Sequence, residues 1–229
     1  MFSYKKTGEG KEVILLHGWG STKETFDDVC NHLKEDFTCY QIDLPGFGES
    51  KIEKSMSLDD YTDLLREFIL EQNIKNPIIL GHSFGGRIAI NYASAYEVDK
   101  LILVDSAGIR RFNLKVYLKI RCYKLFKKFN IKNNFGSIDY KKSNYILKGT
   151  MNKIVPIDLR KKMKMIKSET LILWGSLDET TPLKDGKEIN KLISNSVLIT
   201  IPKTSHFPYL ENHRYFMLML NSFLVSDNS

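Results

Sequence analysis

The sequence predicts an α/β protein whose mostly parallel sheet is covered by helices on both faces. Two observations carry this prediction: short apolar segments recur along the chain, and stretches with a helical pattern lie between them. The chain has 229 residues, of which 42% are hydrophobic, so it is long enough for one large domain or two small ones with a sizeable core. A charged fraction of 27% argues against wholesale disorder.

Six apolar segments are expected to form strands, because each is short and most are bounded by polar or turn residues. Helices should fill the gaps between them. Ser57 precedes the first clear amphipathic stretch, and Ser57 and Asp60 have the spacing of a capping box. Further helices are expected over 84–96 and 209–224. The expected strands are 13–16, 37–42, 77–80, 101–104, 170–174 and 197–201.

The interval 109–168 interrupts this alternation and carries most of the positive charge. It contains 18 Lys or Arg and two acids, whereas the rest of the chain contains 16 bases and 25 acids. Apolar residues recur at helical spacing from 114 to 129, which predicts a basic amphipathic helix. We therefore expect a core formed by 1–108 and 169–229, with 109–168 as an inserted helical, strongly basic cap. A uniformly basic nucleic-acid binder would not be divided in this way, so we expect no nucleic-acid partner.

Three interpretations of the basic interval remain open. The charges can simply be solvated, as on most helix surfaces. They can instead attract an anionic substrate toward the site. Finally, a basic amphipathic helix can lie on an anionic membrane surface, gaining roughly 1 kcal/mol for each Lys or Arg near that surface.

The cysteines and the amino terminus bear on the compartment. Cys30, Cys39 and Cys122 are odd in number and form no CxxC pair, which indicates neither a disulfide framework nor a zinc site. No apolar run approaches the roughly 18 residues of a membrane span, and no apolar stretch follows the charged residues near Met1. We expect a soluble, cytoplasmic protein.

The most specific motif is GHSFGG at 81–86, which lies directly between an expected strand and an expected helix. This is the context of a nucleophile elbow, in which small residues two before and two after Ser83 let its hydroxyl project from a sharp turn. The alternative is an ordinary strand-to-helix turn with a capping serine.

A serine hydroxyl needs a base to remove its proton, so a histidine must approach Ser83 in the folded chain. Downstream of Ser83 only His206 and His213 are available. His206 follows the last expected strand and is the candidate base, whereas His213 falls within the final expected helix and is expected on the surface or in packing.

The acid that orients this histidine should also follow a strand. Asp178 lies in a loop that opens directly after the segment 170–174 and closes at a proline that can start a helix. Thr181 is the expected cap of that helix, which leaves Asp178 free for the acid role. Asp105, at the end of another strand, and Glu179 are the alternatives.

Backbone amides that bind a developing oxyanion are expected in the HGWG loop at 17–20. This loop follows the first expected strand, so the amides of Trp19 and Phe84 would form the oxyanion hole. The alternative is a phosphate-binding loop, because Gly18, Gly20 and Asp43 loosely match a dinucleotide fingerprint whose third glycine is missing here.

Together these motifs resemble the α/β-hydrolase superfamily along nearly the whole chain. The resemblance implies a Ser83, Asp178 and His206 triad, and it places 109–168 where members of this family carry a cap. It implies a serine hydrolase that cleaves a carboxylic ester or thioester of a small molecule and needs no metal or organic cofactor. The motifs are HGWG, DLPGFGES from 43 to 50, GHSFGG, LILWGSLDETTP from 171 to 182 and SHFPYLE from 205 to 211.

The same resemblance leaves other functions open. Ser83 excludes the family members that use a nucleophilic aspartate. Hydrolysis of a carbon–carbon bond is the enzymatic alternative, and a catalytically silent binding protein, or a lipid-binding member at a membrane surface, is the alternative from another class. Arg87 is expected to be structural, or else to contact a substrate anion. The segment 43–48 is expected to shape the loop beside the site.

Overall fold

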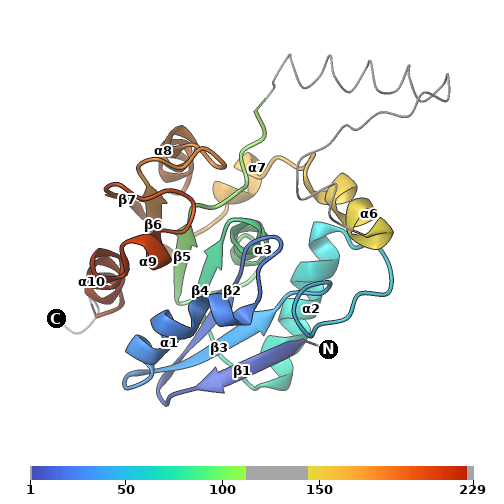
Figure 1. The fold of residues 1–229 in the computed structure, drawn as a ribbon, viewed down its shortest axis with the longest axis horizontal. Helices are drawn as coiled ribbons and strands as arrows, with labels where there is room; N and C mark the ends of the chain where they lie inside the picture. Colours follow the sequence, from blue (N-terminus) through green and yellow to red (C-terminus); the bar gives the residue numbers. More distant parts are fainter. Residues whose placement is uncertain (1, 112–143, 226–229) are drawn as a thin grey trace.

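The structure is a computed structural model that describes residues 2–111 and 144–225. Within these residues the centre is a seven-stranded sheet in the order β1-β3-β2-β4-β5-β6-β7 (Figure 1). β1 pairs with β3 in antiparallel fashion, and the other neighbouring pairs are parallel. The strands are β1 (Ser3–Thr7), β2 (Lys11–Leu16), β3 (Phe37–Asp43), β4 (Ile78–His82), β5 (Lys100–Val104), β6 (Glu169–Gly175) and β7 (Ser196–Ile201).

The helices cover both faces of this sheet, as the sequence predicted. Along β2, the buried side chains of Val13 and Leu15 belong to one apolar cluster, and those of Ile14 and Leu16 belong to the other. This alternation is the period of two that strands impose on their side chains. The helical segments are η1 (Lys23–Phe26, a 3-10 turn), α1 (Asp27–Leu33), α2 (Leu58–Glu71), α3 (Phe84–Ala93), α6 (Tyr145–Ile154), α7 (Arg160–Met163), α8 (Leu183–Leu192), α9 (Pro208–Glu211) and α10 (His213–Leu224).

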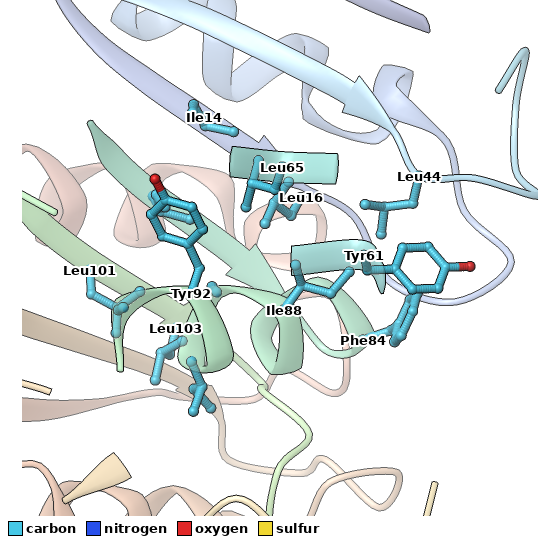
Figure 2. Close-up of a cluster of buried hydrophobic side chains, with 14 of the residues drawn as sticks. Ile14, Leu16, Leu44, Tyr61, Leu65, Phe84, Ile88, Tyr92, Leu101 and Leu103 are labelled. Atoms are coloured by element: carbon cyan, nitrogen blue, oxygen red, sulfur yellow. The ribbon is translucent and has the colours of Figure 1, made fainter. Parts of the chain in front are cut away.

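The larger apolar cluster joins the sheet to α2, α3, α6, α7 and α8. Figure 2 shows side chains of α2 and α3 packed over strand residues, with Tyr61 beside Phe84. The two rings meet edge to face, with centroids 5.2 Å apart. The smaller cluster joins the other face of the sheet to α1, α9 and α10. Because α3 is buried on nearly all sides, the helix that follows Ser83 is held firmly against the sheet.

The six expected strands all form, and the capping box of α2 is confirmed. The Ser57 hydroxyl accepts a hydrogen bond from the Asp60 amide, and the Asp60 carboxylate accepts one from the Ser57 amide. The expected helix over 209–224 is instead two helices, α9 and α10. They are separated by Asn212, whose side chain accepts a hydrogen bond from the Tyr215 amide and caps α10.

The described part of the expected cap contains α6 and α7 and no strand. Figure 1 shows α6 beside the start of α2, and two hydrogen bonds join these regions: Met56 amide to Thr150 hydroxyl, and Lys153 ammonium to Ser55 carbonyl. The amphipathic helix expected over 114–129 lies outside the described residues. Among the residues that the structure describes, no helix is both long and apolar enough to cross a membrane.

Candidate active site

Ser83 lies at the junction between β4 and α3, where the chain turns sharply. Its backbone has φ +49°, in the left-handed region that few residues other than glycine adopt. The turn is possible because the flanking glycines have no side chains. A Cβ on Gly81 would lie 2.7 Å from the Gly85 carbonyl oxygen, and a Cβ on Gly85 would lie 2.1 Å from the Leu16 carbonyl oxygen. The glycines thus let the elbow pack directly against the end of β2.

The structure brings Ser83, His206 and Asp178 together from three separate loops. His206 Nε2 lies 3.0 Å from Ser83 Oγ, and His206 Nδ1 lies 2.7 Å from Asp178 Oδ2. An ionised carboxylate only accepts hydrogen bonds, so Nδ1 carries the proton and donates to Asp178. Nε2 is then free to accept the Ser83 proton. This is the arrangement in which an imidazole can act as a general base toward the hydroxyl.

Asp178 is held as a carboxylate by several donors. The amides of Thr180 and Thr181 lie 2.7 and 3.0 Å from Oδ1, and the Thr181 hydroxyl lies 2.7 Å from Oδ2. Burial acts to raise the pKa of Asp178, but hydrogen bonds, including those from His206 and Thr181, outweigh it and hold the pKa well below its usual range. The expectation that Thr181 caps the next helix is wrong: Pro182 occupies that position, and the Thr181 hydroxyl instead contacts Asp178.

His206 is also fixed through its own backbone, by a residue that the sequence analysis missed. His82 Nε2 lies 2.7 Å from the His206 carbonyl oxygen, and His82 Nδ1 lies 3.4 Å from the Tyr209 hydroxyl. Burial, together with repulsion from the nearby His206, lowers the pKa of His82 to about 3, so His82 is a neutral donor. Its position directly before Ser83 in the GHSFGG motif was the available signal.

The loop that carries His206 is secured further by Glu211. The Glu211 carboxylate accepts hydrogen bonds from the Ser205 amide, the Ser205 hydroxyl and the Phe207 amide. Burial acts to raise the pKa of Glu211, but these three hydrogen bonds lower it below its usual value. An ionised carboxylate therefore braces the backbone on both sides of His206.

The HGWG loop lies against the start of α3. The Gly85 amide donates to the His17 carbonyl oxygen at 3.1 Å, and the rings of Trp19 and Phe84 have centroids 5.2 Å apart. No acceptor for the amides of Trp19 or Phe84 occurs among the described residues. His17 Nε2 accepts a hydrogen bond from the Leu44 amide, which ties this loop to the segment after β3.

The remaining candidates do not reach Ser83. His213 begins α10, with Nδ1 3.2 Å from the Tyr209 carbonyl oxygen. Glu179 is exposed. Arg87 is buried, and its guanidinium donates to the carbonyl oxygens of Ile154 and Ile157. Asp105 makes no hydrogen bond with Ser83 either, but it is fully buried next to Asp178 and His206.

One cluster of the described residues has the composition of a metal site. Asp105, Asp178 and His206 each offer one potential ligand atom, and these atoms lie within 4.8 Å of one another. The direct contact of 2.7 Å between His206 and Asp178 is a hydrogen bond, and it uses the atoms that a metal ion would need. The arrangement is therefore accounted for by hydrogen bonding alone, and we assign no metal to it.

A model of the α/β hydrolase fold matches residues 11–118, which include the HGWG loop and the elbow at Ser83. The chain therefore has the α/β-hydrolase fold. It is 29% identical to the AB hydrolase superfamily protein YisY of Bacillus subtilis, over 89% of this chain and 88% of that protein. It is 28% identical to the pimeloyl-[acyl-carrier protein] methyl ester esterase of Wigglesworthia glossinidia brevipalpis, over 99% of both chains.

A solved structure agrees with this fold. The esterase EaEST from Exiguobacterium antarcticum superposes with a TM-score of 0.77 at 23% identity, and the match covers 97% of this chain and 94% of the esterase. The α/β-hydrolase fold predicted from the sequence is therefore confirmed.

Proposed function

We propose that this α/β hydrolase is a serine esterase that cleaves a carboxylic ester through an acyl-enzyme intermediate. The observation that carries the proposal is the continuous chain of hydrogen bonds from Ser83 Oγ through His206 to Asp178. Relatives named as methyl ester esterases support ester hydrolysis. The donor-rich setting of Asp178 supports its role as the acid that orients the imidazole.

In the proposed reaction His206 Nε2 takes the proton of Ser83 as Oγ bonds to the carbonyl carbon of the ester. The amides of Trp19 and Phe84 stabilise the negative charge that develops on the carbonyl oxygen. When the tetrahedral intermediate collapses, the imidazolium gives its proton to the leaving alcohol and the acyl group stays on Ser83. Water then attacks the acyl group, His206 takes the water proton, and the acid is released as Oγ regains a proton.

We further propose that the ester is carried on an acidic partner such as an acyl carrier protein. Several relatives bear the name pimeloyl-[acyl-carrier protein] methyl ester esterase. The strongly basic interval 109–168 is the part of the chain with matching charge, and Lys161 and Lys164 expose part of this charge at α7. Of the three interpretations of the basic interval, this proposal adopts the second: its positive charge attracts an anionic substrate toward the site.

Labelling with a fluorophosphonate probe and turnover of an activated ester test the esterase proposal. We expect Ser83→Ala to abolish labelling and to lower kcat by roughly a thousandfold or more. Ser222→Ala is the matched control, because Ser222 is exposed on α10 and bonds only to its own helix. Equal labelling of wild type and Ser83→Ala would refute the proposal and favour the silent binding protein.

The same assay separates the carrier from a free ester. We expect Lys161→Glu combined with Lys164→Glu to lower kcat/KM for a carrier-linked methyl ester by roughly fivefold or more, while the free ester is unaffected. Added salt should have the same selective effect. If both substrates respond equally, the acidic carrier is wrong even though the esterase proposal stands.

A further inference from the structure

Asp105 ends β5 at the same edge of the sheet as the proposed triad, and its side chain is fully buried. It approaches Asp178 and His206 closely, since one potential ligand atom of each lies within 4.8 Å of the others. Its backbone has φ +40°, a conformation that aspartate and asparagine tolerate better than most residues. Two carboxyl groups therefore face one imidazole in a space shielded from water.

Only one of the two side-chain oxygens of Asp105 accepts a hydrogen bond from a described residue. Asp105 Oδ1 accepts from the Gly175 amide at 2.9 Å. Asp105 Oδ2 is buried, and no donor for it occurs among the described residues. An ionised carboxylate has nothing to donate, so Oδ2 would be an orphaned acceptor. A protonated carboxyl group has one O–H to donate, and the Asp178 carboxylate is the acceptor beside it, since the potential ligand atoms of the two groups lie within 4.8 Å of each other.

The electrostatic surroundings favour the protonated form of Asp105. Burial raises the pKa of Asp105 to about 9, the hydrogen bond to Asp178 adds to this, and the Gly175 amide opposes it. Among the described residues, the charged groups that act most on Asp105 are Asp178 and Glu211 of α9, and both are acidic. His206 and Tyr209 are the other titratable groups near Asp105. Two buried carboxylates this close would repel each other, so only one of them ionises.

We propose that Asp105 keeps its proton in the folded protein and donates it as a hydrogen bond to the Asp178 carboxylate. Asp105 is then a positioning residue, which acts on the imidazole of His206 only through Asp178. The donated bond holds the carboxylate so that Oδ2 stays aimed at His206 Nδ1. The catalytic consequence rests on the proposed esterase function, whereas the location of the proton does not.

Substitutions at Asp105 separate a proton donor from a second negative charge. Asp105→Asn keeps an oxygen for the Gly175 amide and replaces the O–H by an N–H donor. We expect it to retain kcat within roughly fivefold of wild type, whereas Asp105→Leu, which has no donor, lowers kcat by roughly 10- to 100-fold with little change in KM. If Asp105→Asn loses as much activity as Asp105→Leu, or if Asp105→Leu keeps full activity, the proposal is overturned.

Thermal unfolding against pH tests the proton without relying on catalysis. Folded Asp105 keeps its proton up to about pH 9, whereas an aspartate in the unfolded chain ionises near pH 3.9. Between these values unfolding releases a proton, so wild-type stability falls as the pH rises. Asp105→Asn cannot ionise and therefore lacks this pH-dependent loss of stability. The Tm of Asp105→Asn minus the Tm of wild type should increase by roughly 5 °C or more from pH 5 to pH 8.

Asp99→Asn is the matched control for the unfolding series, because Asp99 is exposed and its ion pair within the described part of the chain is with Lys11, across 3.5 Å. We expect its Tm difference from wild type to be the same at pH 5 and pH 8. A flat difference for Asp105→Asn as well would overturn the proposal. If wild type shows no Ser83-dependent labelling, the esterase function fails, and the unfolding series still decides where the proton lies.

Discussion

Arg87 joins the helix of the proposed nucleophile to the described part of the expected cap, and this contact can be tested quantitatively. Arg87 lies one turn into α3 and is 8% exposed. Its guanidinium donates to the carbonyl oxygen of Ile154, at the end of α6, and to that of Ile157 just beyond. These bonds hold the returning chain against the core. Both bonds come from one terminal nitrogen, and the buried Nε has no partner among the described residues.

Replacing Arg87 by methionine keeps the apolar stem and removes both donors. Each lost hydrogen bond from a charged donor costs about 1.5 to 3 kcal/mol. The Ile154 carbonyl oxygen still accepts from the Ile157 amide, whereas the Ile157 carbonyl oxygen loses the donor that Arg87 supplies. Removal of the guanidinium recovers part of this, because burial disfavours the charge and lowers the pKa of Arg87 to about 10. The net loss should be about 2 kcal/mol, which for a domain of this size lowers Tm by about 4 to 8 °C.

Thermal unfolding and ester kinetics measured together provide the test. Arg66→Met is the matched control, because Arg66 is exposed on α2 and, among the described residues, its guanidinium hydrogen-bonds to Tyr96 and stacks on its ring. We expect Arg66→Met to change Tm by less than about 2 °C. For Arg87→Met we expect the ratio of KM values for neutral and carboxylate-bearing esters to stay unchanged. An unchanged Tm with a raised KM for carboxylate-bearing esters alone would refute the structural role and make Arg87 an anion contact.

Two further substitutions test the supports of the site. His82→Phe keeps a ring but removes the donor to the His206 carbonyl oxygen, so kcat should fall roughly 10-fold. His82→Gln keeps a donor and should lose less; if it loses as much as His82→Phe or more in steady-state assays, the hydrogen bond is not what supports His206. Lys23→Met leaves the buried Asp43 carboxylate without its ammonium partner at 2.7 Å and should lower the free energy of unfolding by about 3 kcal/mol. Lys5→Met, which breaks an exposed pair, should change it by about 0 to 1 kcal/mol in urea denaturation. Similar values for the two lysines would contradict a structural role for the buried pair.

Most of the sheet could be predicted because its strands are buried on both faces and are therefore continuously apolar. β1 (Ser3–Thr7) escaped prediction for the opposite reason. It is an edge strand with exposed polar side chains, and its sequence SYKKT contains no apolar run. The break between α9 and α10 was missed because apolar residues continue across it, whereas the cap at Asn212 depends on backbone geometry.

The proposed triad could be predicted residue by residue, but its supports could not. Ser83, Asp178 and His206 all follow strands, and the carboxyl ends of parallel strands meet at one edge of a sheet. Nothing in the spacing reveals that His82 bonds to the backbone of His206, because that contact spans 124 residues. The role of Thr181 was likewise misassigned, since a threonine before Pro182 fits a helix cap equally well in sequence.

The same rule of strand ends that found Asp178 could not separate it from Asp105, and the reason is physical. Both aspartates follow a strand at the same edge of the sheet, so sequence position alone does not show which of them orients the histidine. What differs is the number of donors each receives: Asp178 accepts from two amides, a hydroxyl and His206, whereas Asp105 accepts from one amide. A buried carboxyl group ionises only where donors replace the water it has lost. The choice of acid is therefore made by the loop around Asp178, and moving the negative charge to Asp105 would require moving those donors with it.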